Sequence, residues 1–315
     1  MKLTTKQIKG FIKQFDGLAY RLKALSIIWS SFLTKYISDE TYIIRQYRRK
    51  TGRKLQLENP KLYNEKIQWM KLYYRNPLLK QCVDKVEVRK YVKSKIPHVE
   101  KHLIPIIDVY ESVDEIDFGV LPKQFVMKLS NGSSFNYICY DNSKREIKRI
   151  RKRFRLWKRL DYYSIGREWA YKGVQNRIIC EKLLLTNAGI LPDDYKFYCF
   201  DGKVEIIAVN TEVYVDRKRQ SSFCKNLYTT SWEYMEGSIG YPNSPDRLVE
   251  KPKMLGEMID FAEALSKDFP AVRVDMYYFD EMFYFGELTF YPASGYQKIV
   301  PIELEILMGN KITII

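Results

Sequence analysis

The chain has 315 residues, of which 46% are hydrophobic and 15% aromatic, a composition that excludes a disordered protein and allows a large core. Its 53 Lys and Arg residues outnumber 38 Asp and Glu residues, and the net charge of +15 favours an anionic partner: a nucleotide, nucleic acid, acidic polysaccharide or membrane surface. The five cysteines lack CxxC spacing, which argues against a zinc site or disulfide framework and favours the reduced thiols of a cytoplasmic protein.

The first 58 residues are basic and have a helical pattern, and no apolar segment typical of a signal peptide follows Met1. The apolar run at 24–32 is too short to span a bilayer. Two interpretations remain for this region: helices packed on the rest of the protein, or a peripheral contact with the inner face of the membrane. Asn59-Pro60 marks its end, because proline disfavours a helical conformation in the preceding residue.

Helical and strand patterns are mixed through the rest of the chain, which is typical of the α+β class. Helices are predicted at 64–73, 144–159 and 252–268, and strands at 103–109 and 177–185. A strand, a loop and a second strand are predicted within 124–140, and a hairpin that turns at Asp201-Gly202 within 194–209. We expect four regions, with the boundaries 1–58, 59–122, 123–185 and 186–315.

The segment 144–159 holds ten Lys or Arg residues, while Ile147, Ile150, Phe154 and Trp157 fall at helical spacing. It is therefore predicted to be an amphipathic helix with a cationic outer face. Nucleic acid is one partner for such a face, but no nucleic-acid motif accompanies the helix, so we expect a solvated face and no nucleic-acid binding.

The loop after Lys128 is built of small residues, which expose backbone N–H groups and hydroxyls of the kind that bind polyphosphates. It comprises Ser130, Asn131, Gly132, Ser133 and Ser134. A strand follows the loop where a P-loop would have a helix, so the P-loop class is excluded. The alternative is an ordinary serine-rich hairpin turn.

Two β-branched and aromatic runs, VRVDMYYF and MFYFGELTF, predict a β-hairpin near the end of the chain. No Gly or Asn supplies the positive φ of a two-residue turn, so we expect a three-residue loop over 280–282. That loop places Asp275 opposite Glu287 and Arg273 opposite Thr289. Facing carboxylates repel unless a cation lies between them, and oxygen ligands beside an Arg indicate Mg²⁺ with phosphates. Two solvated strand-end charges are the alternative.

Six stretches carry a family resemblance: NPKLYNEKIQWMKLYYRNP, DKVEVRKYV, YKFYCFDGK, GYPNSP, FPAVRVDMY and YFGELTFYPASG. With them the chain resembles the ATP-grasp superfamily, and within it the teichuronopeptide-biosynthesis (TupA-like) branch, from about residue 35 onward. That branch occurs in bacterial capsule and surface-polysaccharide clusters. The resemblance implies two α+β subdomains that clasp ATP, here with an N-terminal helical extension. It makes 123–185 the lid subdomain and 186–315 the subdomain with the metal site.

The resemblance also implies roles for individual residues. Lys85 and Lys128 would contact the α- and β-phosphates, with residues 130–134 closing over them. Glu181, Lys182 and Leu183 would border the adenine, and Asp194 would bind the ribose hydroxyls. Asp275 and Glu287 would hold Mg²⁺ with Thr289, where superfamily members usually carry Asn. Arg273 would steady the transferring phosphoryl group and the later oxyanion.

The implied reaction is ADP-forming ligation of a carboxylate to an amine through an acyl phosphate. The expected substrates are an anionic surface glycan or its lipid-linked precursor, with a uronic acid as the carboxylate, and an amino acid or other amine. Arg217, Lys218 and Arg219 are candidate substrate contacts. The alternative is a polysaccharide glycosyltransferase, as members of this branch are often labelled, although the sequence has no Asp-x-Asp motif. With only two histidines, His98 and His102, no Ser-His-Asp arrangement can be argued.

Overall fold

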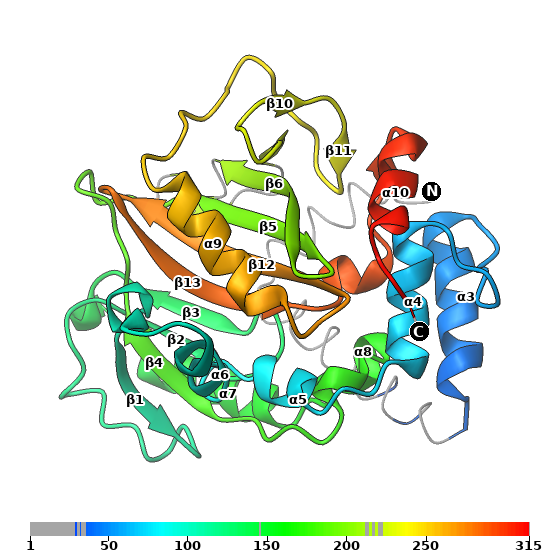
Figure 1. The fold of residues 1–315 in the computed structure, drawn as a ribbon. Coiled ribbons are helices and arrows are strands. Elements are labelled where there is room, and N and C mark those ends of the chain that lie inside the picture. Colours follow the sequence, from blue (N-terminus) through cyan, green and yellow to red (C-terminus); the bar gives the residue numbers. More distant parts are fainter. Residues whose placement is uncertain are drawn as a thin grey trace, which may run out of the picture.

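The computed structural model describes residues 29, 32, 36–144, 146–211, 214–215, 218–219 and 223–314. Two antiparallel sheets, of four and six strands, dominate this part of the chain (Figure 1). Helices α3 (Asp39–Thr51), α4 (Tyr63–Tyr73) and α10 (Ile302–Asn310) lie together at one side (Figure 1). The expected α+β class is confirmed. Most of the predicted basic region 1–58 lies outside the described residues.

The smaller sheet has the order β1 (Ile106–Tyr110), β4 (Ile178–Lys182), β2 (Phe125–Leu129) and β3 (Asn136–Cys139). Helix α7 (Ile147–Lys158) packs on it through Ile150, Phe154 and Trp157, as its spacing predicted. These side chains share a core with Phe125 and Met127, which alternate on β2 with partly exposed residues. The small sheet therefore has a hydrophobic core of its own.

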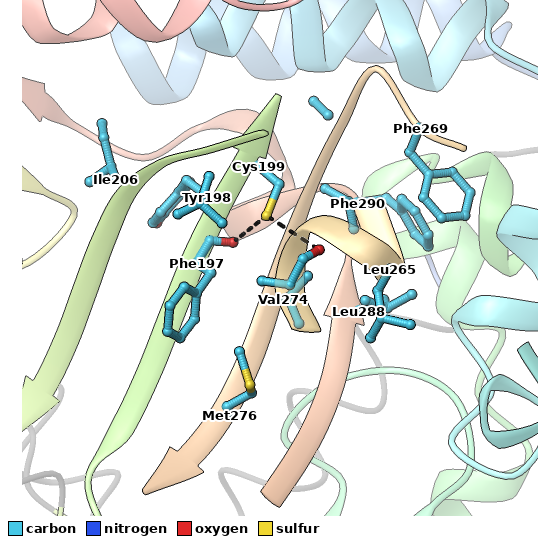
Figure 2. Packing of buried hydrophobic residues seen from close by; sticks show 14 of the residues in the cluster. Phe197, Tyr198, Cys199, Ile206, Leu265, Phe269, Val274, Met276, Leu288 and Phe290 are labelled. Atoms are coloured by element: carbon cyan, nitrogen blue, oxygen red, sulfur yellow. Dashed lines mark hydrogen bonds between the residues drawn. The ribbon is translucent and has the colours of Figure 1, made fainter. Parts of the chain in front are cut away.

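The larger sheet has the order β10 (Tyr234–Met235), β9 (Cys224–Tyr228), β6 (Lys203–Thr211), β5 (Asp194–Phe200), β12 (Ala271–Phe279) and β13 (Met282–Thr289). Helix α9 (Leu255–Ser266) covers one face, where Phe197, Val274 and Met276 pack near Leu265 (Figure 2). Successive strand residues point to opposite faces, so the residues that alternate with these point away from α9. The predicted turn at Asp201-Gly202 is confirmed between β5 and β6.

The remaining elements are short. In the described part of the chain they are α5 (Leu78–Cys82), α6 (Val88–Lys95) and α8 (Tyr162–Gly166), four 3₁₀ turns, and two-stranded pairs of β11 (Ser238–Ile239) with β14 (Ile299–Val300) and of β7 (Tyr214–Val215) with β8 (Lys218–Arg219). One 3₁₀ turn, η4 (Pro292–Gly295), follows β13. Within the described ranges, no helix is both long and apolar enough to cross a membrane.

The β12–β13 hairpin has a shorter turn than expected but the expected pairing of Asp275 with Glu287. Phe279 pairs with Met282, so the turn has two residues, Asp280 and Glu281, with φ of 50° and 59°. The three-residue loop was wrong, because these acidic residues adopt the left-handed conformation without a glycine. The pairing then shifts by one residue between Asp275 and Met276, where Gly286 is the extra residue of a bulge. Beyond the bulge Asp275 pairs with Glu287, as expected.

Candidate active site

A cavity of about 220 Å³ lies between the two sheets. The small-sheet side supplies Lys128 and the loop residues 132–134, with Lys85 from the turn before α6. The large-sheet side supplies Asp194 and Lys196 of β5, Asp275 and Tyr277 of β12, and Glu287 of β13. Lysines on one wall, and carboxylates beside Lys196 on the other, make the cavity suitable for an anion that is bound together with a cation.

The five predicted loop residues divide into two groups. Ser130 and Asn131 are buried anchors: the Ser130 hydroxyl donates to Asp84 at 2.7 Å, and the Asn131 amide donates to the Val174 carbonyl at 3.1 Å. Gly132, Ser133 and Ser134 instead line the cavity. The loop thus presents three residues to a ligand and holds its shape with the other two.

The two predicted lysines border the cavity. The Lys85 ammonium donates to the Gly132 carbonyl at 2.9 Å and lies 3.7 Å from the Glu287 carboxylate. Burial lowers the pKa of Lys85, an effect that Glu287 opposes. Lys128 forms a 2.5 Å ion pair with Glu181, which is buried. Both cations are therefore held at the mouth of the small-residue loop.

A second, more apolar cavity of about 170 Å³ adjoins the first and shares Lys128, Asn136, Asp194 and Tyr277 with it. Its walls include the hydrophobic side chains of Ile104, Val126, Ile138, Leu183, Leu184 and Leu191. Glu181 and Lys182 also line it, but the Lys182 N–H already donates to the Pro105 carbonyl at 3.0 Å. A flat apolar group bound here would continue into a polar, charged group in the first cavity.

Charged residues of β5 and β12 form a row of ion pairs on the large-sheet side of the cavity. Arg273 donates to both oxygens of Asp275, at 2.6 and 2.7 Å, and Lys196 lies 2.8 Å from Asp275 and 2.6 Å from Asp194. Burial alone would raise the pKa of Asp275, but Arg273 and Lys196 outweigh it and lower this pKa. For Asp194 burial prevails and its pKa is raised. Lys196 was missed by the sequence analysis, although a lysine two residues after Asp194 in an aromatic strand was a signal.

The donor atoms fit Mg²⁺. Asp275, Glu287 and Thr289 offer only oxygen, and Thr289 joins the row by hydrogen bonds with Arg273 at 3.2 Å and Glu287 at 3.3 Å. Among the described residues, no three His, Cys, Asp or Glu side chains cluster closely enough to hold a metal. A site with two carboxylates suits Mg²⁺, which takes its other ligands from phosphates and water. Asp275 keeps a free lone pair on Oδ1, and Glu287 has 38% of its side chain exposed.

A larger cavity of about 580 Å³ continues along the same face of the large sheet and shares Ser133, Asp194, Lys196 and Glu287 with the first. It was not foreseen from the sequence, since its walls come from β6, β9, β12 and the segments 240–241 and 293–298. Of the candidate substrate contacts, Arg217 lies outside the described residues, and Lys218 and Arg219 are described only as the backbone of β8.

Helix α4 holds one wall of this larger cavity. Ala293, Ser294 and Gly295 all have positive φ, of 47°, 58° and 68°. Helix α4 donates hydrogen bonds to the carbonyls of Ser294 and Gly295: Gln68 donates to Ser294 at 3.0 Å and to Gly295 at 2.6 Å, and Lys71 donates to Ser294 at 2.6 Å. Ala293, Tyr296 and Gln297 reach the cavity from this segment.

Comparison of the chain with known proteins identifies a matching family. The family described as TupA-like ATPgrasp matches residues 65–313. No curated protein matches the chain. D-alanine–D-alanine ligase from Bacillus anthracis is a similar solved structure, with 19% identity, a TM-score of 0.41, and 67% of this chain and 58% of that chain covered.

Two further solved structures are similar. D-alanine–D-alanine ligase from Helicobacter pylori has 12% identity and a TM-score of 0.41, with 80% of this chain and 67% of that chain covered. The ATP-grasp ligase PsnB, complexed with minimal precursor, Mg and ADP, has 12% identity and a TM-score of 0.35, with 72% and 57% covered. The chain thus spans less than two thirds of the Bacillus anthracis ligase and of PsnB.

Proposed function

The chain belongs to the TupA-like ATP-grasp family, and from this premise we propose that it is an ADP-forming carboxylate–amine ligase. The observation that carries the proposal is the continuity of the apolar cavity with the cavity of lysines and carboxylates, joined at Lys128 and Asp194. A nucleotide has the same order of groups, with an apolar base at one end and phosphates at the other.

In this proposal ATP lies with its adenine beside Leu183 and the carbonyl of Lys182, and its ribose hydroxyls at Asp194. Lys85, Lys128 and the exposed backbone of 132–134 bind the phosphates. Asp275 and Glu287, with Thr289, would hold Mg²⁺, which neutralises phosphate charge when bound. Glu181 fixes Lys128 through their ion pair.

The chemistry needs charge neutralisation and positioning more than acid–base groups. An oxygen of the substrate carboxylate attacks the γ-phosphorus, the bond to the bridging oxygen breaks, and ADP leaves. The nitrogen of an amine then attacks the acyl carbon, phosphate leaves, and the amine loses one proton to solvent. Arg273 is placed beside Asp275 and Thr289 to stabilise the negative oxygen that forms in each step.

We further propose that the carboxylate belongs to a uronic acid of a bacterial surface polysaccharide or its lipid-linked precursor, and the amine to an amino acid or related compound. The support is the net charge of +15 and the cationic outer face of α7. Such charge would attract an anionic polymer to the protein and would hold the protein at anionic lipids of the inner membrane face. A glycosyltransferase remains the competing function.

The test combines two measurements. ATP with Mg²⁺ should stabilise the protein against heat, whereas UDP-sugars should not. Incubation with ATP, Mg²⁺, amino acids and uronic-acid oligosaccharides should give ADP and an amide product by mass spectrometry. Release of AMP would overturn the acyl-phosphate mechanism, and a transferred sugar would overturn the ligase class.

A further inference from the structure

The cavity of about 580 Å³ lies next to the two cavities proposed to bind ATP. It is lined by a buried cation, Lys225, that has no acidic partner among the described residues. Lys225 of β9 is only 4% exposed, and its ammonium donates to the Ile239 carbonyl at 2.9 Å and lies 5.1 Å from the centre of the Tyr241 ring. Within the described part of the chain, no carboxylate lies within ion-pair distance of it. A buried charge without a counter-charge is unfavourable, and an anionic ligand in the cavity would supply that counter-charge.

The surroundings of Lys225 are cationic as well. Burial is the main cause that lowers the pKa of Lys225, to about 7, and Arg273 and Lys196 lower it further, while Asp194 and Asp275 oppose them. Lys298 lines the same cavity. Asp194 and Asp275 already pair with Lys196, so the wall keeps an excess of positive charge.

Polar groups on this wall also lack partners. Asn210 Oδ1, the Tyr296 hydroxyl and Gln297 Nε2 are buried and have no hydrogen-bond partner among the described residues. Together they offer an acceptor, a donor and a group that can be either. Phe223 and Tyr241 stack at 4.0 Å between ring centroids and form an apolar wall beside them. A ligand with hydroxyls, an apolar ring face and a negative charge would satisfy all of these groups.

We propose that this cavity binds the sugar acid that provides the reacting carboxylate, and that Lys225 is the residue that selects for its negative charge. The inference rests on the proposed ligase function and adds the site that binds the sugar acid and the residue that selects its charge. The cavity is large enough for more than one sugar residue. It shares Glu287 and Ser133 with the phosphate cavity, so a carboxylate bound here would lie next to the γ-phosphate. The apolar part of the bound sugar is expected to contact the Phe223–Tyr241 pair.

The test measures binding of trigalacturonate by calorimetry, in the presence of Mg²⁺ and a non-hydrolysable ATP analogue. Its methyl ester is the neutral probe with the same sugar rings, and free glycine is the amino-acid probe. The wild type should bind the acid at least about 30-fold more tightly than the ester, because the ester leaves Lys225 unpaired. Equal binding of acid and ester, or preferential binding of glycine, would overturn the proposal without any mutation.

Variants then locate the effect. Lys225→Met should weaken trigalacturonate binding about 30-fold, Lys225→Arg should retain most of it, and Lys251→Met, at an exposed lysine outside the cavity, should not change it. Unchanged binding by Lys225→Met would overturn the assignment.

Binding of the ATP analogue is measured for each protein and should be the same in all of them. If the wild type binds the ATP analogue but does not bind trigalacturonate, this inference alone is wrong. Absence of ATP binding in the wild type would defeat the proposed function and this inference together.

Discussion

Lys196 and Asp275 face each other across β5 and β12, and the ammonium of the lysine lies 2.8 Å from the carboxylate. The same ammonium lies 2.6 Å from Asp194. Asp275 is therefore fixed by two cations, Arg273 and Lys196, whereas Glu287 across the hairpin is half-exposed, and its nearest charged partner among the described residues is Lys85 at 3.7 Å. The two carboxylates of the hairpin should consequently respond very differently to mutation.

Glu287→Gln is expected to abolish Mg²⁺-dependent ATP turnover while the melting temperature stays close to that of the wild type. Lys85, its ion-pair partner at 3.7 Å, keeps its hydrogen bond to the Gly132 carbonyl, so the loss of the half-exposed carboxylate should cost little stability. Turnover measured over a Mg²⁺ titration gives the answer. Glu281→Gln, in the turn of the same hairpin, is the matched control and should keep full activity; equal turnover in both variants would contradict the metal assignment.

Asp275→Asn should lower the free energy of unfolding by about 3 kcal/mol or more, because it leaves the buried Arg273 and Lys196 without this counter-charge. Relief of carboxylate repulsion does not compensate, since these cations already neutralise Asp275. Denaturant unfolding of Asp275→Asn, Lys196→Met and the double variant measures the coupling. We expect the double variant to lose at least about 1 kcal/mol less than the sum of the single variants. Strict additivity would show that the pair is not coupled.

Gly286→Ala should reduce turnover, because a Cβ at this bulge would lie 3.0 Å from the Asp275 carbonyl oxygen and would push the two strands apart. A stability loss of about 1–2 kcal/mol should accompany the change. Gly256→Ala is the control with the opposite sign: nothing lies within 4 Å of its Cβ, and it lies in α9, so the protein should become more stable by about 0.5–1 kcal/mol. Wild-type activity in Gly286→Ala would show that the bulge does not position the carboxylates.

Binding of trigalacturonate should take up a fraction of a proton per site at pH values just above about 7. The folded pKa of Lys225, about 7, lies below its ordinary 10.5, and a bound anion favours the charged form and raises it. The affinity should therefore be highest below about pH 7 and decline as the pH rises above it. In the free protein, the burial of charged Lys225 lowers the free energy of unfolding. This contribution is fully present below about pH 7 and disappears as the pH approaches 10.5.

Calorimetry in buffers of different ionisation enthalpy measures the proton uptake. Lys225→Met serves as the control, and its residual binding should show no uptake. Uptake that is equal in the wild type and in the variant would assign the proton to another group.

Local sequence patterns were sufficient to predict most strands and helices, because the apolar residues of each element recur with the period of that element. The hairpin shows where local reasoning failed: Asp280 and Glu281 form a two-residue turn that their composition disfavours, supported by stacking of Phe279 on Tyr284. The bulge at Gly286 offsets this one-residue error, so the Asp275–Glu287 pairing was still predicted correctly.

The contacts between distant strands could not be predicted from spacing. Nothing in the local sequence of β5 indicates that β12 will be its neighbour, so the bridging position of Lys196 was not foreseen. The cavity around Lys225 is lined from five strands, β5, β6, β9, β12 and β13, and from several loop segments, and its residues have no common motif. The resemblance to a family supplied the residues of the proposed nucleotide site, whereas the proposed substrate cavity became visible only in three dimensions.

The hydrogen bonds from Gln68 and Lys71 to the carbonyls of Ser294 and Gly295 affect how this protein can be recombined with its relatives. Helix α4 precedes the sheets in the chain, and it would be an obvious place to join the front of one relative to the back of another. The contacts bind it to carbonyls 223 to 227 positions later, in the wall of the proposed substrate cavity. A chimaera that exchanges α4 alone would remove the donors from that wall, so residues 292–297 should be exchanged together with the helix.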